Sequence, residues 1–284
     1  MRTLSGIGRV LRRVCGTLPG GVGAVIVALV MVAAIFAPFV ATHDPDRLDV
    51  MNRFAAPSAA HLLGTDHLGR DLFSRLVHGA SVAMAVALTS ILVALTAGTL
   101  LGILAAWLPT QGERLVLILF DVISSFPSLV LALAIVAVFG PSTLMVIIIV
   151  GITLTPHFGR VARAQVLALK SAPFLEAERI LGASFPRIVF RHILPNIMGP
   201  LVVLASMDIP VVITIEAGLS FLGLGVRPPL ASWGVLIQDG YQFLSDSAIP
   251  VIVASAALAL ATLGFTLFGE ALRDAVDPRI RQER

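Results

Sequence analysis

The sequence predicts an all-α, polytopic membrane protein with six transmembrane helices. Of its 284 residues, 57% are hydrophobic and only 13% are charged. The mean hydropathy is +0.96, and apolar stretches recur along most of the chain. Because the apolar stretches recur, the chain is not a single anchor that carries a soluble domain. Because each stretch is continuously apolar, it is not an outer-membrane barrel, whose strands alternate apolar and polar residues. A helical protein with several membrane spans remains.

A spanning helix needs about 20 mostly apolar residues, because unpaired backbone groups in hydrocarbon are costly. Six uncharged or nearly uncharged stretches meet this requirement. They predict spans at Val22 to Val40, Ser81 to Leu108, Leu115 to Phe139, Thr143 to Phe158, Ile197 to Leu219 and Pro250 to Gly269.

The first two spans are bounded by polar residues. The first precedes Asp44, and the second ends at Pro109. The first 42 residues have an alternative interpretation as a cleaved signal peptide, because Arg12 precedes the apolar run and small residues surround Ala41. The apolar centre has the full length of an anchor, which favours a span.

Internal breaks define the later spans. Between Arg114 and Arg160 the only charge is Asp121, and Gly140-Pro141-Ser142 divides this stretch into the third and fourth spans. The sixth span begins at Pro250, where the missing N–H of proline is harmless.

Basic residues predict the orientation, because cytoplasmic segments of membrane proteins are enriched in them. With the N-terminus inside, fifteen of the twenty basic residues are cytoplasmic and five are outside. The outer five are Arg47, Arg53, Arg70, Arg75 and Arg227. Both termini are therefore expected in the cytoplasm of a bacterium whose inner membrane holds the chain. The excess of basic residues is explained by their enrichment on the cytoplasmic side of the membrane, so no nucleic-acid partner is expected.

The predicted organisation has three parts. Residues 1–78 hold the N-terminus, the first span and an outer loop; residues 79–270 form a five-helix core that includes a cytoplasmic segment at 160–196; residues 271–284 form a cytoplasmic tail. The chain is not expected to be an enzyme. Its only lysine, Lys170, follows Leu169, so a Gly-Lys-Ser/Thr phosphate loop does not occur, and no His-Glu-x-x-His zinc motif is found. No cofactor or metal site is predicted.

The cytoplasmic segment predicts two short helices joined at a glycine. Pro173 begins the first helix, with Glu176 in its first turn, and Gly182 ends it. A second short helix is expected from Arg187 to His192, before Leu194-Pro195 redirects the chain into the fifth span. Such a knob would fit a groove on a partner. An amphipathic helix lying on lipid headgroups is an equally weighted alternative.

This segment resembles a known family. Glu176-Ala177-Glu178, Gly182 and Ile193-Leu194-Pro195 resemble the Glu-Ala-Ala…Gly…Ile-x-Leu-Pro motif of permease subunits in binding-protein-dependent ABC importers. The chain departs from it at Glu178, where the motif has alanine, and at His192, where it has isoleucine.

Further patterns resemble the C-type permeases of the dipeptide, oligopeptide and nickel branch. They are Leu63 to Asp71 with Ser74-Arg75, Leu219 to Val226 with Pro228-Pro229 and Ser232-Trp233-Gly234, and Asp274 with Pro278-Arg279. The resemblance implies a type I ABC importer permease fold and half of a translocation pore. It also implies a second, homologous permease, two ATPase subunits that hold ATP and Mg²⁺, an external substrate-binding protein, and a coupling helix within Glu176 to Pro195.

Acidic residues inside the spans are candidates for the translocation path, because burying them in hydrocarbon is expensive. Asp208 is expected either to face the path or to cap a helix resumed after Pro210. Glu216 is expected to pair with another helix rather than to bind substrate. Asp121 lies near the cytoplasmic end of its span, and the simpler interpretation is an acid whose carboxylate extends to the membrane surface.

The outer loop contains Asp66, Arg70 and Asp71, and it is expected to dock the binding protein or to form a lid on the outer mouth. A structural role for these residues is the simpler interpretation. An ion pair between Arg70 and Asp71 is one expectation. Peptides are the expected substrate. The alternatives are a self-contained secondary transporter or channel, and an importer for another solute such as glutathione or a nickel complex.

Overall fold

The computed structural model describes residues 8, 10 and 12–276. Its elements are α2 (Leu18–Ile35), α3 (Ala37–Val40), η1 (Val50–Asn52), α4 (Leu72–Trp107), α5 (Thr110–Ser125), α6 (Ser128–Phe139), α7 (Thr143–Lys170), α8 (Pro173–Ile180), α9 (Phe185–Ile188), η2 (Val189–Ile193), α10 (Leu194–Phe221), α11 (Trp233–Gln242) and α12 (Ile249–Val276). The elements of the described part are all helical, as predicted. The predicted tail beyond Val276, Pro278-Arg279 and five of the basic residues used for orientation lie outside the described residues.

Among the described residues, five helical stretches are long and apolar enough to cross a membrane, and a bent pair adds a sixth. The five are α2, α4, α7, the continuous stretch Phe185–Phe221, and α12. This agrees with the predicted count of spans. Several helices extend beyond the predicted apolar limits. For example, α7 continues past Phe158 to Lys170, because a helix can continue into water with charged residues after its apolar part ends.

The predicted third span, however, is not a single helix. α5 and α6 meet at an angle of 88°, and Phe126 between them is extended, with φ −93° and ψ 129°. The cause is Pro127, because a proline ring disfavours helical geometry in the residue before it. The expectation of one straight span from Leu115 to Phe139 is therefore wrong, because the chain bends sharply at this point.

Glycines allow a close contact between α4 and α7. A Cβ atom on Gly98 would lie 2.6 Å from the carbonyl oxygen of Thr155, and one on Gly102 would lie 2.3 Å from the carbonyl oxygen of Gly159. The four-residue spacing of Gly98 and Gly102 is the small-residue pattern that brings membrane helices together. These two helices therefore form the centre of the bundle.

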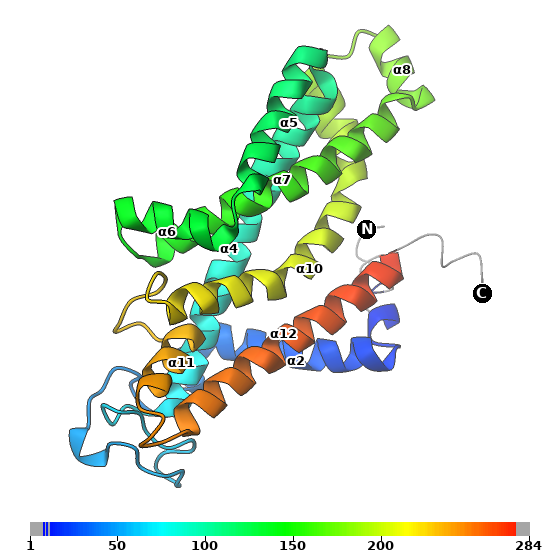
Figure 1. Cartoon of the computed structure of the whole chain (residues 1–284). Helices are drawn as coiled ribbons and strands as arrows, with labels where there is room; N and C mark the ends of the chain where they lie inside the picture. Colours follow the sequence, from blue (N-terminus) through cyan, green and yellow to red (C-terminus); the bar gives the residue numbers. More distant parts are fainter. Residues whose placement is uncertain (1–7, 9, 11, 277–284) are drawn as a thin grey trace.

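The remaining helices pack around this centre and separate two polar regions. α2 lies along α12, where a Cβ atom on Gly23 would approach the backbone nitrogen of Phe268 to 2.6 Å. α8 lies at one end of the molecule, and the loop between α3 and α4 lies at the opposite end, beside α11 (Figure 1). The predicted cytoplasmic segment and the predicted outer loop are thus at opposite ends.

Candidate functional site

α8 is anchored by one side chain and presents apolar surface at its far end. It begins at Pro173 and has Glu176 in its first turn, as predicted. Leu175 is fully buried, whereas Ile180 and Leu181 are each 81% exposed. Two large apolar side chains at the tip of a short helix cost hydrophobic free energy unless something covers them.

The turn after α8 fixes how its end is presented. Gly182 has φ +78°, the left-handed conformation that glycine adopts most readily. The N–H of Ala183 donates to the carbonyl of Glu178, 3.0 Å away, and that of Leu181 donates to the carbonyl of Ala177. The bond from Ala183 to Glu178 is the six-to-one contact of a Schellman motif, which satisfies a carbonyl at the helix end. Gly182 therefore ends α8, as predicted.

The expected second short helix does not stand apart. α9, η2 and α10 form one continuous helical stretch, so Leu194-Pro195 does not redirect the chain as expected. Within η2 the N–H of Leu194 donates to the carbonyl of Val189, five residues earlier. This wider turn accommodates Pro195, whose ring would otherwise clash with a carbonyl four residues back. Ile193 is fully buried, and Pro195 is exposed.

The two residues that depart from the family motif contact one another. Nε2 of His192 lies 3.2 Å from Oε1 of Glu178, and the two side chains are 20% and 31% exposed. The pair connects α8 to η2. The two departures therefore form one contact between α8 and the helical stretch that leads into the fifth span.

We expect Glu178 and His192 to be energetically coupled. In a double-mutant cycle, Glu178→Ala and His192→Ile should show a coupling energy of about 0.2–1 kcal/mol, the usual value for a partly exposed pair. Unfolding of the purified chain in detergent measures it. Glu176→Ala combined with His192→Ile is the control and should be additive; an additive result for Glu178 and His192 as well would show that the contact contributes nothing.

Asp121 is paired rather than isolated. Nη2 of Arg160 on α7 donates to its Oδ1 at 2.8 Å. The side chain of Asp121 is 73% exposed and that of Arg160 is 45% exposed. A second pair, Arg163 with Glu113, joins the same two helices. These charges connect α5 to α7.

Asp208 lies within an unbroken helix. α10 continues through both Pro200 and Pro210, so Asp208 does not cap a helix that restarts after Pro210. Its Oδ2 atom is 3.9 Å from Nε2 of His157 on α7, and the structure describes no hydrogen-bond donor for this buried oxygen. The sequence analysis did not connect His157 with Asp208. The two are far apart in the chain, and no motif joins them.

Glu216 is enclosed by this chain. Its side chain is fully buried, and its Oε1 atom accepts a hydrogen bond from Oγ of Ser220 at 2.8 Å. Oγ of Ser220 in turn accepts from the N–H of Val226, at 3.0 Å. The carboxylate thus holds the loop between α10 and α11, a position that favours a structural role.

In the outer loop, Asp66 organises a buried turn. Its Oδ1 accepts the N–H groups of Leu68 and Arg70, each at 2.9 Å, and its Oδ2 accepts Nε of Arg70 at 2.7 Å. Arg70 also reaches Asp239 on α11, 3.3 Å away. The loop is therefore attached to the region that follows the fifth span.

The expected pair between Arg70 and Asp71 is wrong. Asp71 is the N-cap of α4, and its Oδ2 accepts both the N–H and the Oγ–H of Ser74, at 2.8 and 2.7 Å. Capping turns the carboxylate away from Arg70 and toward His61, whose Nδ1 lies 2.9 Å from Oδ1. Burial alone would raise the pKa of Asp71, but the hydrogen bonds from Ser74 and His61 outweigh it, and the pKa lies below its usual value.

The structure thus defines a multi-pass membrane protein with an exposed apolar knob at one end and an ordered polar loop at the other. Two family models match the chain. Residues 98–282 match the binding-protein-dependent transport system inner membrane component, and residues 20–57 match the N-terminal transmembrane domain of oligopeptide transport permease C. The chain belongs to the family of inner-membrane permease components of binding-protein-dependent transport systems.

Several characterised relatives are similar over most of their length. The dipeptide transport system permease protein DppC of Alkalihalophilus pseudofirmus is 37% identical over 260 residues, covering 92% of this chain and 86% of the relative. The probable D,D-dipeptide transport system permease protein DdpC of Escherichia coli is 38% identical, with 90% and 86% covered. A glutathione transport system permease protein, GsiD of Escherichia coli, is 39% identical, with 91% and 86% covered.

Solved structures show the same fold. The MetNI methionine ABC transporter in an inward-facing conformation superposes with a TM-score of 0.57 and 19% identity, covering 72% of this chain and 96% of the matched chain. This similarity confirms the predicted type I importer permease fold. The predicted family and fold are thereby established.

Proposed function

We propose that this chain forms one half of the translocation path of an ATP-driven importer for short peptides. Relatives that share 37–38% identity with it carry the names of dipeptide and D,D-dipeptide permeases. A glutathione permease at 39% identity makes glutathione the main alternative substrate. Substrate choice within this proposal depends largely on a separate binding protein, which docks against the outer loop around Asp66, Arg70 and Asp71.

The coupling role is carried by one observation, the exposed apolar end of α8. Ile180 and Leu181, each 81% exposed, project beyond the membrane helices, and a groove on an ATP-binding subunit would cover them. The exposed carboxylate of Glu176 would add charge-assisted hydrogen bonds at the rim of that groove. Glu176, Ala177, Glu178, Gly182, Ile193, Leu194 and Pro195 are the proposed coupling residues.

The proposed complex contains a second, homologous permease, two ATP-binding subunits, the external binding protein and surrounding lipid. ATP and Mg²⁺ bind to the ATP-binding subunits, and this chain performs no catalysis. Asp208, with His157 nearby, is the proposed polar contact along the path. Asp121 and Glu216 support the helices around it.

Affinity purification from native membranes tests the coupling role. A chain carrying Ile180→Asp and Leu181→Asp should lose the ATP-binding subunits and retain the partner permease. Leu48→Asp, at a 59% exposed position in the opposite loop, is the matched control and should retain both. ATP-binding subunits that remain bound to the double variant would contradict the proposal.

The substrate is tested separately. The complex is purified with its binding protein, and the bound ligand is identified by mass spectrometry. Short peptides are the expected ligand. Glutathione or a metal complex as the sole ligand would overturn the peptide assignment and leave the coupling role intact.

The orientation is a further prediction, in which α8 is cytoplasmic. Nζ of Lys170 donates to the carbonyl of Ala106 at 3.0 Å, so the ends of α4 and α7 that flank Gly112 and Ser171 lie together. In a Cys15→Ser chain, single cysteines at Gly112 or Ser171 should resist an impermeant thiol reagent in intact cells, whereas cysteines at Ser58 or Ser245, in the opposite loops, should react. Reaction at Ser171 would reverse the proposed orientation.

A further inference from the structure

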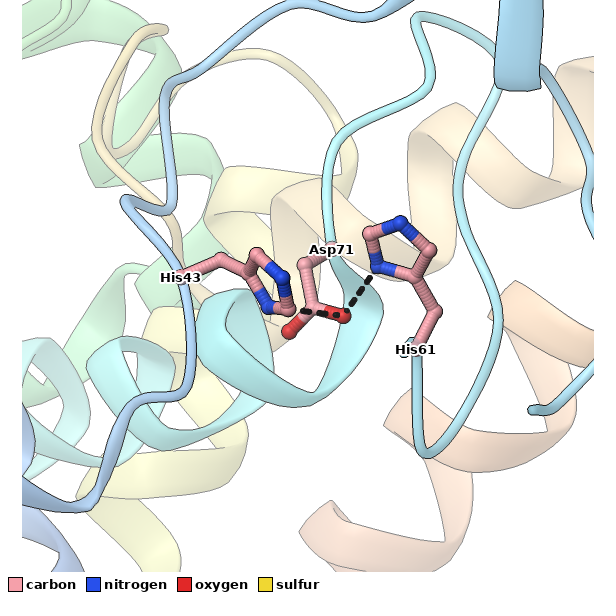
Figure 2. Close-up of side chains that lie close together, drawn as sticks. All are labelled: His43, His61 and Asp71. Atoms are coloured by element: carbon pink, nitrogen blue, oxygen red, sulfur yellow. Dashed lines mark hydrogen bonds and ion pairs between the residues drawn. The ribbon is translucent and has the colours of Figure 1, made fainter. Parts of the chain in front are cut away.

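Three side chains from separate segments converge at the start of α4. His43 follows the first span, His61 lies in the outer loop, and Asp71 caps α4 (Figure 2). One potential ligand atom from each lies within 4.8 Å of the other two. The rings of His43 and His61 are 4.8 Å apart between centroids, and both face the same carboxylate.

The two carboxylate oxygens of Asp71 have different roles. Oδ2 accepts the N–H and Oγ–H of Ser74 and the Oγ–H of Thr42, which holds the side chain in one orientation. Oδ1 faces the histidines, with Nδ1 of His61 at 2.9 Å and Nδ1 of His43 at 3.8 Å. The hydrogen bonds to Oδ2 thus hold the carboxylate so that Oδ1 points at the two histidines and is available as a ligand.

The histidines are also held in place. The N–H of His43 donates to Oγ of Ser74, at 3.0 Å. The carbonyl of His61 accepts the N–H groups of Ser58 and Gly64, at 2.8 and 3.0 Å. The backbone of both histidines is therefore held by contacts that do not depend on a ligand.

Charge favours a cation at this point. The side chain of Asp71 is only 1% exposed, and the ionisable side chains that contact it in the described part of the chain are the two histidines. The nearby arginines are engaged elsewhere, because Arg70 pairs with Asp66 and Asp239 and Arg75 lies near Asp46 and Asp66. With neutral imidazoles the cluster carries one negative charge, which a divalent cation would offset.

The donor set selects the kind of cation. Magnesium and calcium prefer oxygen ligands, whereas two imidazoles and one carboxylate suit zinc with a fourth position open to water. Bond lengths of about 2.0–2.1 Å to a tetrahedral zinc place its ligand atoms about 3.4 Å apart. The separations of 2.9 and 3.8 Å from Oδ1 of Asp71 bracket that value. The ligand atoms of the three residues all lie within 4.8 Å of one another, so side-chain rotations that bring them about 1 Å closer would complete the site.

We propose that His43, His61 and Asp71 bind one zinc ion on the outer face of this chain. The ion replaces the proton between His61 and Asp71. It joins the end of the first span, the outer loop and the start of α4, and so stiffens the surface around Asp66 and Arg70. The side chains of His43 and His61 are 35% and 20% exposed, which gives the ion access from outside.

Calorimetric titration of the untagged, detergent-solubilised full chain with zinc chloride tests this proposal, after chelator treatment. One zinc ion per chain is expected, with X-ray absorption showing two imidazoles and oxygen around the metal. His43→Gln or His61→Gln should weaken binding at least about 100-fold, because loss of an outer-shell partner alone costs about 10–100-fold. Magnesium chloride at the same concentration should not compete.

His67→Gln is the matched control, because His67 lies in the same loop but its ring stacks on Phe243, 4.7 Å away between centroids. This variant should bind zinc as the wild type does. Unchanged zinc affinity in His61→Gln, equal loss in His67→Gln, or an absorption spectrum without imidazole would overturn the proposal. Gel filtration of each variant shows whether it is folded. If a variant is misfolded, the X-ray absorption spectrum of the wild-type chain decides whether imidazoles bind the zinc ion.

Discussion

Replacing Gly182 with valine should abolish most of the substrate-stimulated ATP hydrolysis of the assembled complex. Gly182 has φ +78°, a conformation that costs other L-residues about 1–2 kcal/mol and β-branched residues more. A Cβ atom there would have no neighbour within 4 Å, so the effect acts through the backbone alone. A cost of this size lowers the ratio of the native α8 turn to alternative turns about 5–30-fold, and coupled hydrolysis should fall by up to the same factor.

Two controls separate this effect from general damage. Gly182→Asn should retain more activity than Gly182→Val, because asparagine tolerates the left-handed region better. Gly199→Val makes the same change at a helical glycine that also has no neighbour within 4 Å, and it should leave coupling unchanged. Equal activity of Gly182→Val and wild type would mean that the turn after α8 does not transmit the signal.

Replacing Gly102 with leucine should prevent a stable bundle from forming. Its Cβ atom would lie 2.3 Å from the carbonyl oxygen of Gly159 and 3.0 Å from the backbone nitrogen of Arg163, and backbone atoms of a packed helix cannot move aside cheaply. The expected loss of stability is at least about 3 kcal/mol, the upper end of the usual cost of overpacking. The thermal stability and yield of the detergent-solubilised chain, followed by fluorescence-detected gel filtration, measure it.

Gly199→Leu is the matched substitution for this experiment, since it adds the same side chain to a membrane helix at a position where a Cβ atom has no neighbour within 4 Å. It should keep a wild-type melting temperature. If Gly102→Leu also kept that temperature and yield, the close approach of α4 and α7 would not be the centre of the fold.

Sequence reasoning found the features that depend on local composition. The apolar spans, the start of α8 at Pro173 and the positive φ of Gly182 follow from hydropathy, proline geometry and glycine freedom within a few residues. The same local rules could have predicted the bend at Phe126, because Pro127 follows it directly. Hydropathy alone concealed the bend, since both arms are apolar.

The remaining differences depend on contacts between distant residues. A π-type turn at η2 lets the helix continue past Pro195. The local sequence predicts a break there, because proline usually interrupts a helix. Asp71 was assigned to its neighbour Arg70, yet capping of α4 directs it toward His61. His43 and His61 have no motif spacing, and only the fold brings them together with Asp71.

Peptide uptake into proteoliposomes tests the central claim most directly. Vesicles are prepared with this chain alone, and with this chain, its partner permease and the ATP-binding subunits, each with binding protein and labelled dipeptide on the side of the outer loop. Uptake is expected only in the complete vesicles and only with ATP and Mg²⁺ on the side of α8, and it should be strongly reduced with Gly182→Val. Uptake by this chain alone, driven by an ion gradient and independent of ATP, would contradict the claim and identify a secondary transporter.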